Sequence, residues 1–149
     1  MITVDNKILE NIQSHLESAY PHEACGFILG YQNQESRTII KALAVDNSST
    51  ENQRRRFIIH PLDYLKAEKQ ALREDLILLG IYHSHPDHPA VPSIHDLEFA
   101  QPFFSYLIHS INSGLLTETR SYRLQNGKFV EENFSLSTYQ ESSRIKITH

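Results

Sequence analysis

The chain has 149 residues, a length that suits one domain and can bury a substantial core. Its hydrophobic content of 40% and charged content of 21% are typical of a soluble globular protein. The formal net charge of −4 argues against nucleic acid as the main partner, because binding to phosphates requires a basic face.

The chain contains one cysteine, Cys25, so it can form neither an internal disulfide nor a zinc site built from several cysteines. The amino-terminal stretch MITVDNKILENIQ lacks the basic and apolar regions of a signal peptide. No apolar run reaches the roughly 20 residues that a membrane span needs. We therefore expect a cytoplasmic protein that does not act on a membrane.

Hydrophobic spacing predicts the elements in chain order. Ile8, Ile12 and Leu16 recur at helical spacing in a first helix, and the apolar run 76–82 is the strongest signal for a central strand. The turn Asn126-Gly127 joins the last two strands as a hairpin. We predict helices over residues 6–20, 61–75 and 93–100, and strands over 25–31, 38–45, 57–59, 76–82, 106–111, 119–124 and 128–131.

Strands that alternate with helices predict one α/β or α+β domain, with a central mixed sheet flanked by helices. We place this domain at residues 1–134, because no linker, repeat or second domain interrupts it. Residues 135–149 form a polar carboxyl-terminal tail that we expect to be frayed.

The stretch GIYHSHPDHPAVPSIHDLEFA, residues 80–100, holds four histidines and three carboxylates in 21 positions. Residues two apart on a strand face the same side, so His83 and His85 can point together at the carboxyl end of the central strand. Asp96, in the first turn of the next predicted helix, can add a carboxylate. Two imidazoles and a carboxylate suit zinc and leave a fourth position for water.

Two segments have competing interpretations. Ser93-Ile94-His95-Asp96 also fits a helix-capping pattern, and a carboxylate committed to a cap is not fully available as a metal ligand. The basic run Arg54 to Arg56 fits either a solvated loop or a patch for a carboxylate or an acidic partner.

The combination His83-Ser84-His85-Pro86 with Ser93 and Asp96 resembles the motif of the JAMM (MPN+) metallopeptidase family, His-X-His-X7-Ser-X-X-Asp with an upstream glutamate. Glu23 is the matching glutamate, and the resemblance runs from about residue 8 to residue 131. It implies a JAMM/MPN fold, which is similar to that of cytidine deaminases. The likeness is greatest to small bacterial members that trim residues from β-grasp sulfur-carrier proteins.

This resemblance implies a role for each motif residue. His83, His85 and Asp96 would bind one zinc ion. Glu23 would act as the general acid and base in catalysis, and Ser93 would donate a hydrogen bond to the oxyanion. The reaction implied is hydrolysis of a peptide or isopeptide bond at the carboxyl-terminal tail of a ubiquitin-like or sulfur-carrier protein, which would be the partner.

Other functions remain open at this point. A deubiquitinase-like isopeptidase shares the chemistry, and a non-catalytic module would bind a carrier without cutting it. A zinc nucleoside deaminase would need a Pro-Cys-X-X-Cys pair that the chain lacks. The oligomeric state and the carrier's identity are not predicted.

Cys25 is interpreted as a buried strand residue, not a nucleophile. The remaining histidines are assigned to loops near the site (His22, His88 and His95) or to structural and surface positions (His15, His60, His109 and His149).

Overall fold

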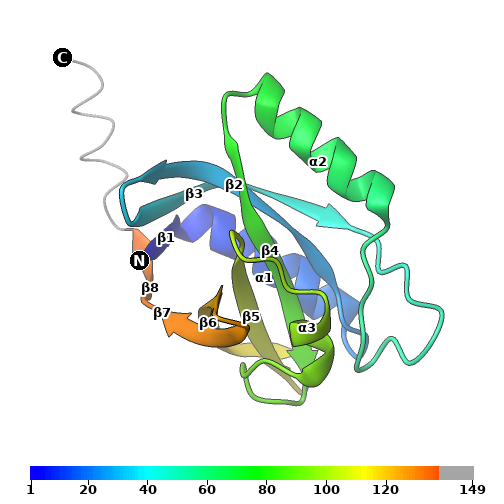
Figure 1. Cartoon of the computed structure of the whole chain (residues 1–149). Helices are drawn as coiled ribbons and strands as arrows, with labels where there is room; N and C mark the ends of the chain where they lie inside the picture. The colour runs from blue at the N-terminus through cyan, green and yellow to red at the C-terminus, as the bar shows by residue number, and fades with distance from the viewer. Residues whose placement is uncertain (138–149) are drawn as a thin grey trace.

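Eight strands pair into one sheet in the computed structural model, which describes residues 1–137. The strands are β1 (Ile2–Asp5), β2 (Cys25–Asn33), β3 (Ser36–Val45), β4 (Ile77–Pro86), β5 (Ser105–Asn112), β6 (Leu115–Gln125), β7 (Lys128–Glu132) and β8 (Phe134–Ser137). Their order across the sheet is β7-β6-β5-β4-β2-β3-β1-β8 (Figure 1). β4 runs parallel to β5, and β1 runs parallel to β3 and β8, while the other neighbours are antiparallel. The sheet is therefore mixed, as predicted.

The helices begin where capping residues place them. α1 (Asn6–Ala19) starts after Asp5, whose carboxylate accepts a hydrogen bond from the backbone N–H of Ile8 at 2.8 Å. α2 (Pro61–Arg73) has a proline in its first turn, where a missing N–H costs nothing. α3 (Ile94–Glu98) is a short helix after β4. All three lie within the predicted ranges.

The two long helices cover opposite faces of the sheet (Figure 1), and each face has its own apolar cluster. Leu16 of α1 packs in the same cluster as Tyr82, whereas Ala67 of α2 packs in the cluster that contains Ile81. Because side chains alternate along β4, His83 and His85 follow Ile81 onto the α2 face. The two-layer packing thus decides the side of the sheet on which the candidate ligands lie.

Several predicted boundaries were wrong. The central strand continues to Pro86, so His83 and His85 lie within β4 and not after it. Residues 57–59 form no strand, because the Ile58 N–H donates to the Asn47 side chain instead of to a neighbouring strand. The short strand β1 was not predicted.

The predicted start of the tail also needs correction. Residues 135–137 belong to β8, which pairs with β1, so these three residues extend the sheet. Residues 138–149, the rest of the predicted tail, lie outside the described residues. Within residues 1–137, no helix is both long enough and apolar enough to cross a membrane.

Candidate metal centre and active site

β4 carries two of the candidate ligands in the middle of the sheet. It lies between β2 and β5, and Cys25 and Ile108 are the register partners of His83 on its two sides. His83 is completely buried and His85 is nearly so. Strand pairing therefore fixes the backbone of His83 on both sides and that of His85 on the β5 side, where Ser110 is its register partner. Strand alternation directs both imidazoles to the α2 face.

The cap of α3 positions the third candidate ligand. The Ser93 N–H donates to Asp96 Oδ2 at 2.8 Å, and the Asp96 N–H donates to Ser93 Oγ at 3.1 Å, which completes a capping box. The capping interpretation of this segment is therefore confirmed. It does not draw Asp96 away from the histidines, because the same carboxylate faces both imidazoles. The expected conflict between cap and ligand roles does not arise in the geometry.

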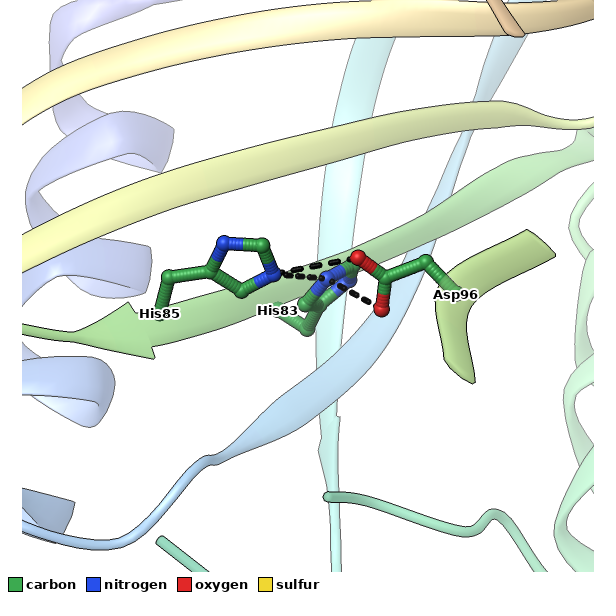
Figure 2. A group of neighbouring side chains, drawn as sticks. All are labelled: His83, His85 and Asp96. Atoms are coloured by element: carbon green, nitrogen blue, oxygen red, sulfur yellow. Dashed lines mark hydrogen bonds and ion pairs between the residues drawn. The ribbon is translucent and has the colours of Figure 1, made fainter. Parts of the chain in front are cut away.

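The ligand atoms of His83, His85 and Asp96 converge (Figure 2), all within 4.8 Å of one another. The two Nε2 atoms are 3.3 Å apart, His83 Nε2 lies 3.2 Å from Asp96 Oδ1, and His85 Nε2 lies 3.1 Å from Asp96 Oδ2. A tetrahedral ion with bonds of about 2.0–2.1 Å separates its ligands by about 3.3–3.4 Å. The donor set and its spacing therefore fit a tetrahedral metal ion.

The other ring nitrogens differ between the two histidines. His85 Nδ1 lies 2.9 Å from the Pro89 carbonyl, which requires an N–H at Nδ1 and leaves the Nε2 lone pair facing Asp96. His83 Nδ1 is buried and has no hydrogen-bond partner among residues 1–137. The His83 ring instead packs against Phe57, with ring centroids 4.5 Å apart. Packing orients His83, whereas a backbone carbonyl orients His85.

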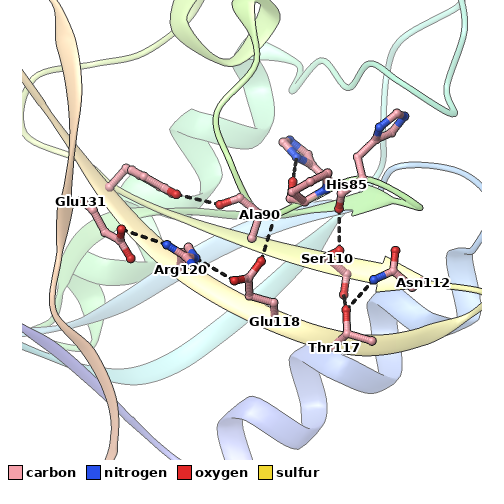
Figure 3. A network of polar contacts seen from close by, with 11 residues as sticks. His85, Ala90, Ser110, Asn112, Thr117, Glu118, Arg120 and Glu131 are labelled. Atoms are coloured by element: carbon pink, nitrogen blue, oxygen red, sulfur yellow. Dashed lines mark hydrogen bonds and ion pairs between the residues drawn. The ribbon is translucent and has the colours of Figure 1, made fainter.

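The loop that supplies this carbonyl is tied to β5 and β6 (Figure 3). The Tyr122 hydroxyl donates to the Ala90 carbonyl at 2.7 Å, and the Ala90 N–H donates to Glu118 Oε1 at 3.3 Å. The Ser110 hydroxyl donates to the His88 carbonyl. We call these three contacts the loop clamp. They fix both neighbours of the proline whose carbonyl faces His85.

Glu23, the predicted acid–base group, follows α1 and precedes β2 in the chain. It is buried, with 7% of its surface exposed. Its N–H donates to the Gln53 carbonyl at 2.6 Å, and its carbonyl accepts from Asn47 Nδ2 at 3.2 Å. The Asn47 side chain also bonds the Arg56 carbonyl and the N–H groups of Ser49 and Ile58. Glu23 is thus held by the loop between β3 and α2, and Asn47 is the centre of that loop.

Burial and mutual contact set the charges of the site. Burial raises the pKa of Glu23 to about 8. Burial alone would raise the pKa of Asp96, but the neighbouring imidazoles hold it well below its ordinary value. Burial lowers the pKa of His83. At His85, burial also acts to lower the pKa, but Asp96, the Pro89 carbonyl and Glu23 together raise it above its ordinary value. In the metal-free protein, the one firmly anionic group at the centre is Asp96.

Two cavities, each of about 370 Å³, meet at this centre. His83 and Asp96 line the first, His85 and Ser93 line the second, and Glu23 lines both. The structure therefore brings all five motif residues to one place, although Glu23 is 60 positions from His83 in the sequence. Sequence reasoning had also singled out His88, His95 and the run Arg54 to Arg56, of which all but Arg54 line a cavity. It missed the apolar lining and the Asn47 contacts, which no local pattern signals.

The other residues singled out in the sequence have simpler surroundings. Cys25 is buried, and burial raises the pKa of its thiol to about 12, so it is not a nucleophile at neutral pH. Arg54 and Arg55 are exposed, whereas Arg56 lies 3.2 Å from His95. The remaining described histidines have different surroundings. His22 is exposed after the end of α1, and His88 lines the second cavity. His15 bonds Tyr82, His60 caps α2, and His109 bonds Thr119. His149 lies outside the described residues.

An α+β domain with a buried His-His-Asp group at the end of a central strand defines the class of JAB/MPN domain proteins. The chain belongs to the Prok-JAB family, described as prokaryotic homologs of the JAB domain, which matches residues 5–125. Both the expected family and the expected fold are therefore confirmed.

Two named relatives are similar to the chain. A Thermus thermophilus protein named probable TtuB-protein conjugate cleaving protease is 32% identical over 130 residues, which are 87% of this chain and 80% of the relative. A Pyrococcus furiosus protein named desampylase is 37% identical over 76 residues, which are 51% of this chain and 50% of the relative. The names of the relatives place them among enzymes, and one is a named protease.

Solved structures share the fold. A protein from Desulfitobacterium hafniense superposes with a TM-score of 0.81 at 30% identity, covering 92% of this chain and 93% of the other. A JAB1/MPN domain protein from Archaeoglobus fulgidus superposes with a TM-score of 0.57 at 17% identity, covering 90% and 97%. The second likeness concerns the fold alone.

Proposed function

We propose that this protein is a zinc-dependent peptidase that hydrolyses a peptide or isopeptide bond at the carboxyl-terminal tail of a ubiquitin-like sulfur-carrier protein. The observation that carries the proposal is the convergence of His83, His85 and Asp96 beside the buried Glu23, where two cavities meet. The names of the two relatives and the motif resemblance support the reaction and the substrate class.

His83, His85 and Asp96 would hold the zinc ion through two imidazole nitrogens and one carboxylate. Zinc is favoured because this neutral–neutral–anionic set with an open fourth position is typical of catalytic zinc sites. When bound, zinc would lower the pKa of a coordinated water toward about 7 and polarise the carbonyl to be cleaved.

Glu23 would move the protons. The positive charge of a nearby cation lowers the pKa of a carboxyl group, so the raised pKa of the buried Glu23 would fall toward neutrality. A group with a pKa near the working pH can accept a proton from the attacking water and then deliver it to the leaving amine. One such positioned group is typically worth roughly 10²–10⁴ in rate.

Ser93 would stabilise the oxyanion of the tetrahedral intermediate. Its oxygen already accepts the Asp96 N–H, so the hydroxyl hydrogen is free to be donated to another acceptor. Ser93 lines the second cavity, next to His85. A single oxyanion donor is worth roughly 10²–10³ in other hydrolases.

The loop of residues 47–56 would help to hold the extended substrate tail beside the site. Arg55 lines both cavities and is exposed, so it is available to a substrate carboxylate. If Arg55→Ala, as well as Arg54→Ala and Arg56→Ala, leaves the cleavage kinetics unchanged, this part of the proposal fails.

The test is intact mass spectrometry of a β-grasp carrier extended beyond its Gly-Gly end. The carrier is incubated with the zinc-loaded protein and, separately, with the Glu23→Gln protein. We expect a mass loss with the wild type only, and its size identifies the bond. No loss from any carrier, with zinc measured in the protein, would favour a non-catalytic carrier-binding module.

An isopeptidase is the second candidate, because one relative is named for cleaving protein conjugates. A lysine-linked carrier conjugate in the same assay separates the two bond types. Faster cleavage of the conjugate than of the linear extension would assign the isopeptide reaction.

A further inference from the structure

The first cavity has an apolar lining that the proposed chemistry does not use. It occupies about 370 Å³ and opens beside His83 and Asp96. Its apolar and aromatic lining residues are Phe57, Ile58, Ile59, Pro61, Tyr64, Ile81, Phe99 and Tyr106. A preformed apolar pocket with a few polar groups is the usual form of a specificity site.

The inner wall of this cavity is built into the core on the α2 face. Ile59, Ile81 and Tyr106 are all buried in that apolar cluster. The Tyr106 hydroxyl is fixed by the Gln101 N–H at 2.6 Å, and the Tyr64 ring packs edge-on to Phe27 at 5.1 Å. These contacts keep the cavity open without a ligand, so little ordering cost opposes binding in it.

The lining of the cavity disfavours a charged occupant, because eight of its fifteen residues are apolar or aromatic. A charged side chain would lose hydration against those residues. A neutral, apolar side chain instead gains from leaving water.

We propose that this cavity binds the apolar side chain of the first residue on the amine side of the cleaved bond. The inference rests on the proposed function, in which the acyl side ends in Gly-Gly. Glycine has no side chain, and the residues before Gly-Gly lie roughly 7 Å or more from the bond along an extended tail. The residue directly after the bond is therefore the nearest one that can place a large side chain in a cavity lined by His83 and Asp96.

The second cavity suits the glycine tail. Its lining includes His85, Ser93 and the loop residues Pro89 and Pro92, and it shares Glu23 with the first cavity. The two cavities would therefore divide the substrate at the scissile bond. The leaving residue would occupy the apolar cavity, and the carrier tail would occupy the other.

The experiment uses the full chain and one carrier ending in Gly-Gly, extended by Gly, Ala, Leu, Phe, Asp or Lys and then a constant segment. We expect the Leu and Phe fusions to be cleaved with a kcat/KM roughly 10- to 200-fold higher than the Gly fusion. Asp and Lys fusions should be no better than Gly. The Glu23→Gln protein should bind the same fusions with affinities in the same order, so that the Leu and Phe fusions have the lowest dissociation constants.

Phe99→Ala tests the cavity directly. Phe99 is 59% exposed at the cavity rim, so its removal should not unfold the protein, but it should reduce the ratio of Leu to Gly cleavage. Phe103→Ala is the matched control, because Phe103 is also exposed but packs over Arg37 outside both cavities. An unchanged ratio in Phe99→Ala, or equal rates for all fusions, would overturn the inference while leaving the peptidase function intact. If no fusion is cleaved, the proposed function fails, and equal affinities for the Glu23→Gln protein would overturn the inference as well.

Discussion

The two sides of the candidate centre are held by different kinds of structure. His83 and His85 belong to β4, which is paired on both sides within the sheet, and the loop clamp adds side-chain bonds from Tyr122, Glu118 and Ser110. Glu23 lies between two elements and is held by a loop that contains no helix or strand. The candidate ligands are thus fixed by the sheet, and Glu23, the proposed acid–base group, is fixed by a loop centred on Asn47.

This difference means that metal binding and proton transfer can be altered separately. A change in the loop clamp acts on His85 through the Pro89 carbonyl and leaves the contacts of Glu23 in place. A change at Asn47 acts on Glu23 and leaves the sheet untouched. If the site were one rigid unit, every supporting change would affect both properties together.

The largest effect is expected for Glu23→Gln, which keeps the shape of the side chain but removes its proton transfer. Turnover should fall roughly 10²–10⁴-fold, because a positioned general acid–base group supplies that factor. Zinc content, measured by elemental analysis, should stay at the wild-type value, because Glu23 is not a member of the His-His-Asp group. Loss of zinc together with turnover would contradict the separation of the two sides.

Tyr122→Phe should weaken metal binding by roughly tenfold, the lower end of the 10- to 100-fold cost of losing a partner bonded directly to a ligand, because Tyr122 acts on His85 only through the loop that carries Pro89. The variant loses only the hydroxyl that holds the Ala90 carbonyl. Competition with a chromogenic chelator measures the affinity, and turnover at saturating zinc should recover most of the wild-type value. The control is Tyr31→Phe, at an exposed tyrosine of β2, which should match the wild type. An unchanged affinity in Tyr122→Phe would show that the clamp does not act on His85.

Asn47→Ala should lower turnover by roughly tenfold or more, because small displacements of a catalytic group reduce the rate steeply. It removes the bonds to the Glu23 and Arg56 carbonyls in one step. Zinc affinity should be that of the wild type, the opposite of the result for Tyr122→Phe. Asn33→Ala, at an exposed position at the end of β2, provides the control. A lower zinc affinity in Asn47→Ala would instead show that this loop also supports the metal ligands.

The ligand side was predictable from the sequence because its signals are local. Two histidines two positions apart after a long apolar run can only face one side of a strand, and the Ser93–Asp96 spacing is a cap that the structure confirms. Glu23 was different: alone it is an ordinary acid near a helix end, and only the family motif singled it out. The distance of 60 positions between Glu23 and His83 leaves no periodic trace in the sequence.

The elements and contacts that the sequence did not predict depend on long-range contacts and not on local patterns. Phe57 to Ile59 reads as a strand because it is apolar, yet its residues line a cavity and one of its N–H groups bonds a side chain. β1 and β8 are only four residues each, too short for a clear alternation. They form strands because β1 pairs with β3 on one side and with β8 on the other. Tyr122 and Asn47 act through contacts that only the folded chain creates.

The stability of the metal-free protein should depend on pH through Glu23. The pKa of Glu23 is raised from 4.5 to about 8, so between these values the folded state holds a proton that the unfolded state has released. The free energy of unfolding of the wild type should therefore fall as the pH rises through this window, relative to Glu23→Gln, by at most about 1.4 kcal/mol per pH unit. Urea unfolding with a chelator at pH 5, 6, 7 and 8 measures the difference between the two proteins, from which shared groups such as Asp96 cancel. With added zinc, the difference in unfolding free energy between the two proteins should depend less on pH, because the cation lowers the pKa of Glu23. Parallel pH profiles without metal would mean that burial does not hold the proton on Glu23, and the loop side would then be more open to water than its geometry indicates.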